Sequence, residues 1–204
     1  MDRMNKTIGR RAFLAVSAMG LTSTLAGCLS LGAGAPVTYD LAPGAPGAVP
    51  QRSNRTIVVR EPSTIATYDS QRIVVRQPGG VLSYLEDSQW SDTLPLLVQT
   101  RMLQSFRDAG VTNIGRPTDP IALDVILSTD IRAFELDTSS GVALARVGLA
   151  IQLVNDRSRT VVASQTFSAD VPSASLEQGD VVAALNTALD ALLREIVGWT
   201  AARV

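Results

Sequence analysis

One cysteine and no histidine limit the chemistry open to this chain of 204 residues. The cysteine ends the run Leu25-Ala26-Gly27-Cys28, which has the form of a bacterial lipobox: an apolar residue, two small residues and the cysteine. Small side chains let a signal peptidase bind the segment extended in a narrow groove, and the cysteine sulfur can carry a diacylglyceryl group. The alternatives are a secreted chain without lipid and a buried structural thiol. We favour a lipid anchor at Cys28, because the residues that follow are typical of a tether.

The residues before Cys28 have the composition of an export signal. Residues 1–11 hold four cations against one acid, and residues 12–27 are apolar or small. A basic head, a short apolar stretch and small residues at the exit are typical of a secretory signal. The stretch is shorter than the about 20 apolar residues that span a bilayer. We therefore expect residues 1–27 to be a cleaved lipoprotein signal peptide, with a second acyl chain such as palmitate on the freed amine to make the attachment stable.

Arg10 and Arg11 are candidates for a twin-arginine export signal. Ala12-Phe13-Leu14 follows them, as in that signal, but Gly9 stands where Ser or Thr is usual. Twin-arginine signals are addresses that a receptor reads. An ordinary basic head for the general secretion route explains the same residues, and the sequence leaves both routes open.

Leu29 follows the cysteine, where an aspartate is the usual signal for retention in the inner membrane of Gram-negative bacteria. By this sorting convention we expect the protein at the outer membrane, on its periplasmic face.

The absence of histidine excludes whole classes of site. Ser-His-Asp and Cys-His catalysis both need an imidazole, as do many zinc and copper sites. With Cys28 committed to lipid, no thiolate remains for metal, redox or disulfide chemistry. We therefore assign no catalytic, cofactor-binding or metal-binding residue and expect a protein that is not an enzyme. A hydrolase that works with carboxylates alone stays as an alternative, which needs two facing acids with displaced pKa values in a cleft.

The composition suits one globular domain. Hydrophobic residues make up 46% of the chain and charged residues 18%, which is enough apolar surface for a core. Removing the basic residues 1–27 makes the formal net charge of −1 more negative. The remaining chain therefore has no excess of positive charge with which to bind nucleic acid. Residues 28–54 are rich in Gly, Ala and Pro and are predicted to form a lipidated flexible tether, which residues 37–41 interrupt as a candidate edge strand. Residues 55–204 are predicted to form a single domain.

Two periodicities predict the elements of that domain. The β-branched run 56–60 predicts a strand, and residues 71–85 predict a hairpin that turns at Gln77-Pro78-Gly79-Gly80. Alternating apolar residues predict three longer strands, joined as an antiparallel meander, over 121–133, 142–154 and 160–168.

Apolar residues at spacings of three and four predict two amphipathic helices. The first covers 93–109, with Asp92 as its expected cap and Gly110 as its stop. The second follows a passage from Leu176 and runs to about residue 201. The order β-β-α-β-β-β-α leaves each helix one apolar stripe to bury, so we predict an α+β fold: a two-layer sandwich with both helices on one face of an antiparallel sheet.

Several short motifs follow one another in a fixed order. Tyr39-Asp40-Leu41 lies near the mature N-terminus, residues 69–76 read Asp-Ser-Gln-Arg-Ile-Val-Val-Arg, and Tyr84 and Trp90 precede the first helix. Residues 130–135 then read Asp-Ile-Arg-Ala-Phe-Glu. Together with the lipobox, this order resembles the ABC-type transport auxiliary lipoproteins, which include the paraquat-inducible lipoprotein C group.

The resemblance implies a role without catalysis. Such lipoproteins are partners of MCE-type transporters, which combine an inner-membrane ATPase and permease with a periplasm-spanning MCE protein that binds lipid. The lipoprotein would be the outer-membrane end of a route for phospholipids or other apolar compounds. The family is not defined by catalytic or ligand residues, so none carries over. An assembly or scaffolding lipoprotein of an envelope complex is the alternative, and a homo-oligomer is left open.

Tyr84 and Trp90 are the candidate partner contacts, because aromatic side chains are enriched at interface hot spots. For Trp90 we favour the other interpretation, in which the ring packs inside and holds the hairpin to the first helix.

Overall fold

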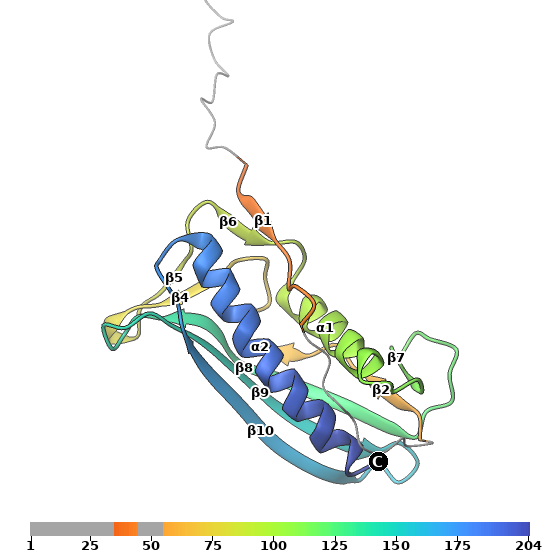
Figure 1. Ribbon diagram of the computed structural model, residues 1–204. Coiled ribbons are helices and arrows are strands. Elements are labelled where there is room, and N and C mark those ends of the chain that lie inside the picture. The colour runs from red at the N-terminus through yellow and green to blue at the C-terminus, as the bar shows by residue number, and fades with distance from the viewer. Residues whose placement is uncertain (1–34, 45–54) are drawn as a thin grey trace, which may run out of the picture. The chain divides into compact units, whose positions relative to one another are not determined.

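The computed structural model describes residues 35–44 and 55–204 (Figure 1). Cys28, Arg10 and Arg11, with the signal peptide predicted for residues 1–27, lie outside the described residues.

Three long strands form the centre of the sheet. β8 (Val125–Asp137), β9 (Leu144–Asn155) and β10 (Val161–Pro172) pair antiparallel in chain order. This is the predicted meander. Along β9 the alternate residues Val147, Leu149, Ile151 and Leu153 are fully buried, as their apolar character requires. β8 starts and ends four residues later than predicted. Its last three residues include Glu135 and Asp137, whose carboxylates form ion pairs with Arg76 and Arg146, so the strand continues past residue 133.

The other edge of β8 carries parallel strands. β2 (Ile57–Val59), β3 (Ser63–Thr64) and β4 (Val74–Arg76) all run parallel to β8, and β7 (Ile114–Gly115) runs parallel to β2. The sheet is therefore mixed, and the prediction of a wholly antiparallel sheet was wrong. The physical reason is that a helix lies between β2 and β8 in the sequence. A strand that returns through a helical crossover enters the sheet in the direction of the strand it left.

The predicted hairpin is confirmed. β4 pairs antiparallel with β5 (Leu82–Tyr84), and the turn between them holds a short 3-10 helix, η1 (Pro78–Gly80). Gly79 and Gly80 have φ of 76° and 79°, a conformation that glycine adopts without strain. The sequence missed β3, β7 and β6 (Ser88–Trp90), since two or three residues are too few to show a period.

Residues 37–41, placed in the predicted tether, are packed on the fold. β1 (Val37–Tyr39) pairs parallel with β6 in a separate two-stranded sheet, and Leu41 is buried in the core.

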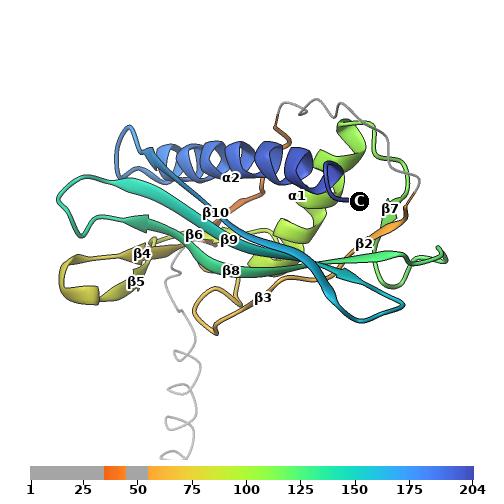
Figure 2. The ribbon, with the colours of Figure 1, turned by 90° about the horizontal axis from the view of Figure 1, so that it is seen from below.

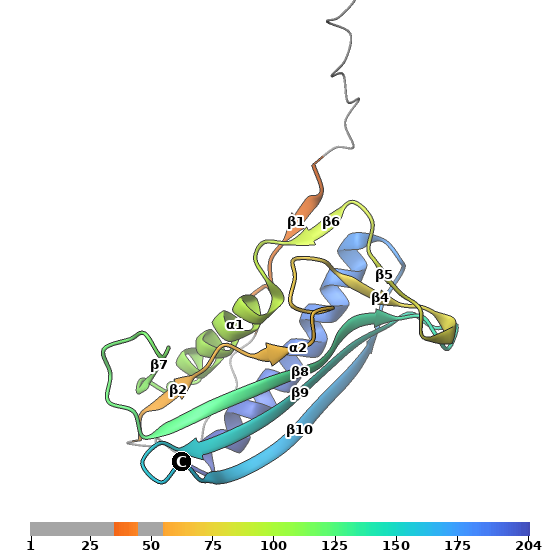
Figure 3. The same cartoon turned by 180° about the vertical axis from the view of Figure 1, so that it is seen from behind.

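Both helices cover the same face of the large sheet, so the predicted α+β arrangement of two layers is confirmed (Figure 2). Seen from behind, β8, β9 and β10 lie in front of α2 (Gln178–Ala201) (Figure 3). α1 (Leu94–Asp108) lies beside α2, and Arg101 joins them by donating from Nη2 to Asp190 Oδ1 at 2.6 Å.

The ends of α1 show which local signals were right. Pro95 lies in the first turn, and Gly110, with φ of 91°, follows the last residues. The expected Asp92 cap is wrong: Thr93 is the N-cap residue, and Asp92 Oδ1 accepts only the N–H of Thr93. With no side-chain cap bond, the helix start depends on Pro95 and on burial of Leu94.

Aromatic side chains join β6 and α2 to the large sheet. Trp90 packs edge-on against Phe134, with ring centroids 5.9 Å apart, and Phe167 does the same with Trp199 of α2 at 5.7 Å. Such pairs add to the burial of large apolar rings.

We predict that Trp90→Ala lowers the free energy of unfolding by about 3–5 kcal/mol, because it leaves a cavity in a closely packed core. Tyr84→Ala is the matched control: its side chain is 42% exposed, so we expect a loss of about 1 kcal/mol or less. Urea denaturation followed by circular dichroism measures both. Equal losses for the two variants would contradict the burial of Trp90.

Candidate functional site

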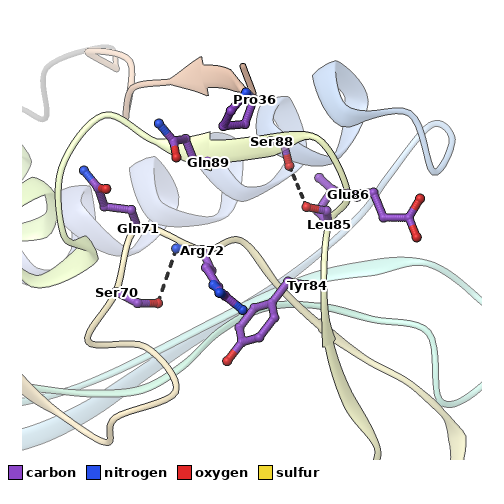
Figure 4. Close-up of a pocket in the computed structure, with 9 residues that line it drawn as sticks. All are labelled: Pro36, Ser70, Gln71, Arg72, Tyr84, Leu85, Glu86, Ser88 and Gln89. Carbon is purple, nitrogen blue, oxygen red and sulfur yellow. Dashed lines mark hydrogen bonds between the residues drawn. The ribbon is translucent and has the colours of Figure 1, made fainter. Parts of the chain in front are cut away.

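A pocket lies beside β1, with Pro36 among its lining residues (Figure 4). It has a volume of about 510 Å³. Its walls come from the start of β1, from the loop before β4, and from the segment between β5 and β6; the lining residues are Pro36, Ser70, Gln71, Arg72, Tyr84, Leu85, Glu86, Ser88 and Gln89.

Tyr84 and Arg72 form the exposed centre of this pocket. The Arg72 guanidinium carbon lies 4.6 Å from the centroid of the Tyr84 ring, a cation–π contact that holds both side chains in place (Figure 4). Both residues are exposed. An aromatic ring stacked with an arginine offers a partner one flat apolar surface and one fixed charge, the two side-chain types enriched at binding hot spots.

Trp90, the second candidate contact, is not on the surface. Its side chain is 1% exposed and packs against Phe134. It therefore cannot touch a partner in this fold, and the alternative of a packing role holds. Trp90 still borders the site through its backbone, because its N–H donates to the carbonyl of Gln71 at 2.7 Å.

Backbone bonds fix the walls of the pocket to one another. Val37 N donates to Asp87 O at 2.8 Å, and Ser91 N donates to Tyr39 O at 2.7 Å, so β1 is bonded at both ends to the segment around β6. Gln178, the first residue of α2, donates from Nε2 to Glu86 O at 2.9 Å and accepts from the Tyr39 hydroxyl at 3.3 Å. The start of α2 thus ties the two strands together.

A buried carboxylate holds the hairpin that carries Tyr84. Glu135 of β8 accepts from the Tyr68 hydroxyl at 2.6 Å, from Arg76 Nε at 2.5 Å and from Arg76 Nη2 at 3.1 Å. The hydrogen bond to Glu135 raises the pKa of the Arg76 guanidinium above its ordinary value, so Arg76 keeps its positive charge at alkaline pH. The cluster joins β4, β8 and the loop before β4, and so sets where the hairpin lies.

A second ionic group continues across the sheet. Arg146 of β9 donates to Asp137 of β8 and, through Nε at 2.9 Å, to Asp170 of β10. Hydrogen bonding from Ser139, together with the charge of Arg146, holds the pKa of Asp137 below its ordinary value. Arg146 thus pairs with the buried carboxylate of Asp137, which is the usual condition for burying a charge, while Asp170 stays exposed.

The lining of the pocket does not match the hydrolase site made of carboxylates alone that the sequence left as an alternative. Glu86 is the one acid among its lining residues, whereas hydrolysis by carboxylates alone needs two facing acids. Within residues 35–44 and 55–204 no group of three or more metal-ligating side chains is found. In the same part of the chain, no helix is long and apolar enough to cross a membrane.

Sequence reasoning missed the residues that position the site. Tyr68 and Asp137 belong to no motif noted in the sequence, and Glu135 was noted only as the last residue of the motif 130–135, without a role in the site. The only local signal was the hairpin itself, which places Arg76 at its turn beside the end of β8.

We predict that stability falls between about pH 10 and 12 because of Tyr68. Burial, and then the hydrogen bond to Glu135, raises the pKa of Tyr68 from 10.0 to about 12. A pKa that is higher in the folded state gives a stabilisation that is complete below the unfolded pKa and lost as pH rises through the folded one. Tyr68→Phe should flatten this part of the profile of unfolding free energy against pH, and Tyr84→Phe should not. The same fall in Tyr68→Phe would assign it to another group.

Comparisons with known proteins agree with the fold. A solved structure of a Xanthomonas campestris protein matches with a TM-score of 0.77 at 27% identity, over 82% of this chain and 95% of that one. A second, uncharacterized structure matches with a TM-score of 0.63 at 10% identity, over 79% of this chain and 96% of that one, which shows the fold alone. An uncharacterized protein of Bradyrhizobium diazoefficiens is 31% identical over 174 residues, or 83% of this chain; the chain spans 47% of that relative's length.

A family model matches residues 39–197, which run from the last residue of β1 to the last turn of α2 and include every lining residue of the pocket except Pro36. This match covers most of the described fold and agrees with the motifs noted in the sequence. The chain belongs to the family of ABC-type transport auxiliary lipoprotein components.

Proposed function

We propose that the protein is an outer-membrane-anchored, periplasmic accessory lipoprotein of an MCE-type ABC system that moves lipid or apolar solutes between two membranes. It acts by docking to protein partners, without catalysis of its own. The observation that carries the proposal is the family match over residues 39–197. The exposed Tyr84–Arg72 pair in a pocket with a single acid supports binding as the mode of action.

The anchor in this proposal is Cys28, freed by removal of residues 1–27. The packed segment starts at Pro36, so the spacer between the lipid and the fold is residues 28–35 rather than the whole stretch 28–54. Eight residues reach at most about 29 Å when fully extended. The end of the fold that carries β1 and the pocket therefore stays near the membrane surface.

The partner in this proposal is the periplasm-spanning MCE protein, with its ATPase and permease behind it. The pocket is its contact surface, with the Tyr84 ring and the Arg72 charge as the central contacts. Exposed acids border the pocket at Glu86 and Asp87, so a partner segment that carries both an apolar and a basic side chain would match it. A second copy of this chain could use the same surface.

The first experiment is a pull-down from detergent-solubilised membranes with tagged wild type and Cys28→Ala. We expect wild type to recover an MCE protein with its ATPase and permease, and Cys28→Ala to leave the membrane fraction. Recovery of an outer-membrane assembly machine or of peptidoglycan would favour the scaffolding alternative. Membrane attachment of Cys28→Ala would contradict the lipid anchor.

The contact surface is tested with single substitutions in the same pull-down. Tyr84→Ala and Arg72→Ala should each reduce recovery of the partner about tenfold, since truncation of a hot-spot residue costs more than 1 kcal/mol. Arg132→Ala is the control, because Arg132 is also an exposed arginine but lies outside the pocket, on β8, paired with Asp130 at 3.5 Å. Equal recovery from all three variants would place the contact elsewhere.

A further inference from the structure

A second cavity, of about 300 Å³, is lined by residues of β2, of the start of β8, of the loop after β7 and of the turn between β9 and β10. These elements lie at the opposite end of the fold from β1 in Figure 1. Its floor is apolar. Val58 and Ile126 are each 4% exposed, whereas Ile121 at the mouth is 40% exposed. An apolar floor of this kind is typical of small-ligand sites, whose volumes start at about 300 Å³.

Three arginines stand around this floor. Arg60, Arg116 and Arg159 line the cavity together with Asp119 and Asp156, which leaves an excess of one positive charge. Arg159 is paired with Asp156 at 3.2 Å. The side chain of Arg60 is exposed and makes no hydrogen bond or ion pair within the described part of the chain, whereas its backbone N–H donates to the carbonyl of Leu127. Its guanidinium is therefore available to a ligand.

Two residues of α1 hold the side chain of Arg116 in position. Its Nε donates to Gln99 Oε1 at 3.4 Å and its Nη2 to Thr100 Oγ1 at 3.0 Å. Gln99 is itself buried and donates from Nε2 to the carbonyl of Val59 at 3.0 Å. These partners are uncharged, so they orient the guanidinium without neutralising it. Donors that are already oriented bind an anion at a lower entropic cost.

The loop that closes the cavity is packed on Gly115. A Cβ added there would meet the carboxylate of Asp119 and the end of Ile121. Asp119 Oδ2 also accepts the N–H of Arg116 at 2.7 Å. The missing side chain at Gly115 thus lets the loop bring the apolar Ile121 and the cationic Arg116 to the same opening.

We propose that this cavity binds an amphiphilic anion: a phosphate or carboxylate headgroup on Arg60 and Arg116, with the start of its apolar chain on Val58, Ile126 and Ile121. Bidentate hydrogen bonds from arginine suit both headgroups. The volume accommodates a headgroup and a short length of chain, and the remainder would leave through the mouth. The site is distinct from the docking pocket beside β1 and does not depend on the proposed partner.

The test uses the mature chain with Cys28→Ser, from which lipid is absent, and three probes in isothermal titration calorimetry: octyl phosphate, octanol and inorganic phosphate. We expect octyl phosphate to bind at least about tenfold more tightly than either of the other two, because only it uses both the arginines and the floor. Arg60→Gln should weaken its binding about tenfold. Arg72→Gln, the matched exposed arginine of the other pocket, should not change it.

Three results would overturn the proposal. Inorganic phosphate that binds as tightly as octyl phosphate would show that the apolar floor is unused. Octanol that binds as tightly would show that the arginines are unused, and binding that resists Arg60→Gln would put the ligand elsewhere. Because Arg60 is exposed, the variant should keep the circular dichroism spectrum of wild type, so a loss of binding reports on the site.

Discussion

The buried carboxylate of Glu135 is the constraint on which the arrangement of the pocket beside β1 depends. A carboxylate with 2% exposure is costly unless hydrogen bonds replace its water. Tyr68 and Arg76 supply those bonds, and both come from the stretch that leads into and forms the hairpin. The hairpin pairs with β8 through only three residues of β4, so its backbone bonds alone define its place weakly. The contacts of Glu135 with Tyr68 and Arg76 fix the place of β4 beside β8. They thereby also fix the positions of Tyr84 and Arg72, which lie on or next to the same hairpin.

The long elements could be predicted from the sequence because each shows its period over many residues. β9 alternates over 12 residues, and α2 repeats its apolar stripe over 24. The parallel strands could not be predicted, since β2, β3 and β7 hold two or three residues each and their direction is set by the crossover through α1. For β1 the edge-strand expectation was right, but its partner β6 has a polar sequence, Ser-Gln-Trp, that gives no strand signal.

For the candidate site, too, some features could be predicted from the sequence and others could not. Tyr84 was named as a candidate contact because aromatic side chains are enriched at interface hot spots, and the structure places its ring on the surface. Trp90 was named for the same reason, yet whether an aromatic ring faces out or in depends on what lies behind it, here Phe134 from a strand more than forty positions later in the chain. The Tyr68–Glu135–Arg76 cluster joins residues from separate elements, and the sequence alone cannot show which acid meets which base.

The parallel pairing of β1 with β6 has a mechanical consequence for an anchored protein. Tension applied through the residues before Pro36 enters the fold along β1. Both strands run in the same direction, and the bonds of Val37 and Tyr39 lie across that axis. A pull along β1 therefore loads these bonds together, in shear, instead of opening them one after another. Beyond β1, the N–H of Ala42 bonded to Asn186 at 2.9 Å and the buried Leu41 carry the load into α2 and the core. A pull applied at Pro36 would therefore be resisted by hydrogen bonds loaded in shear.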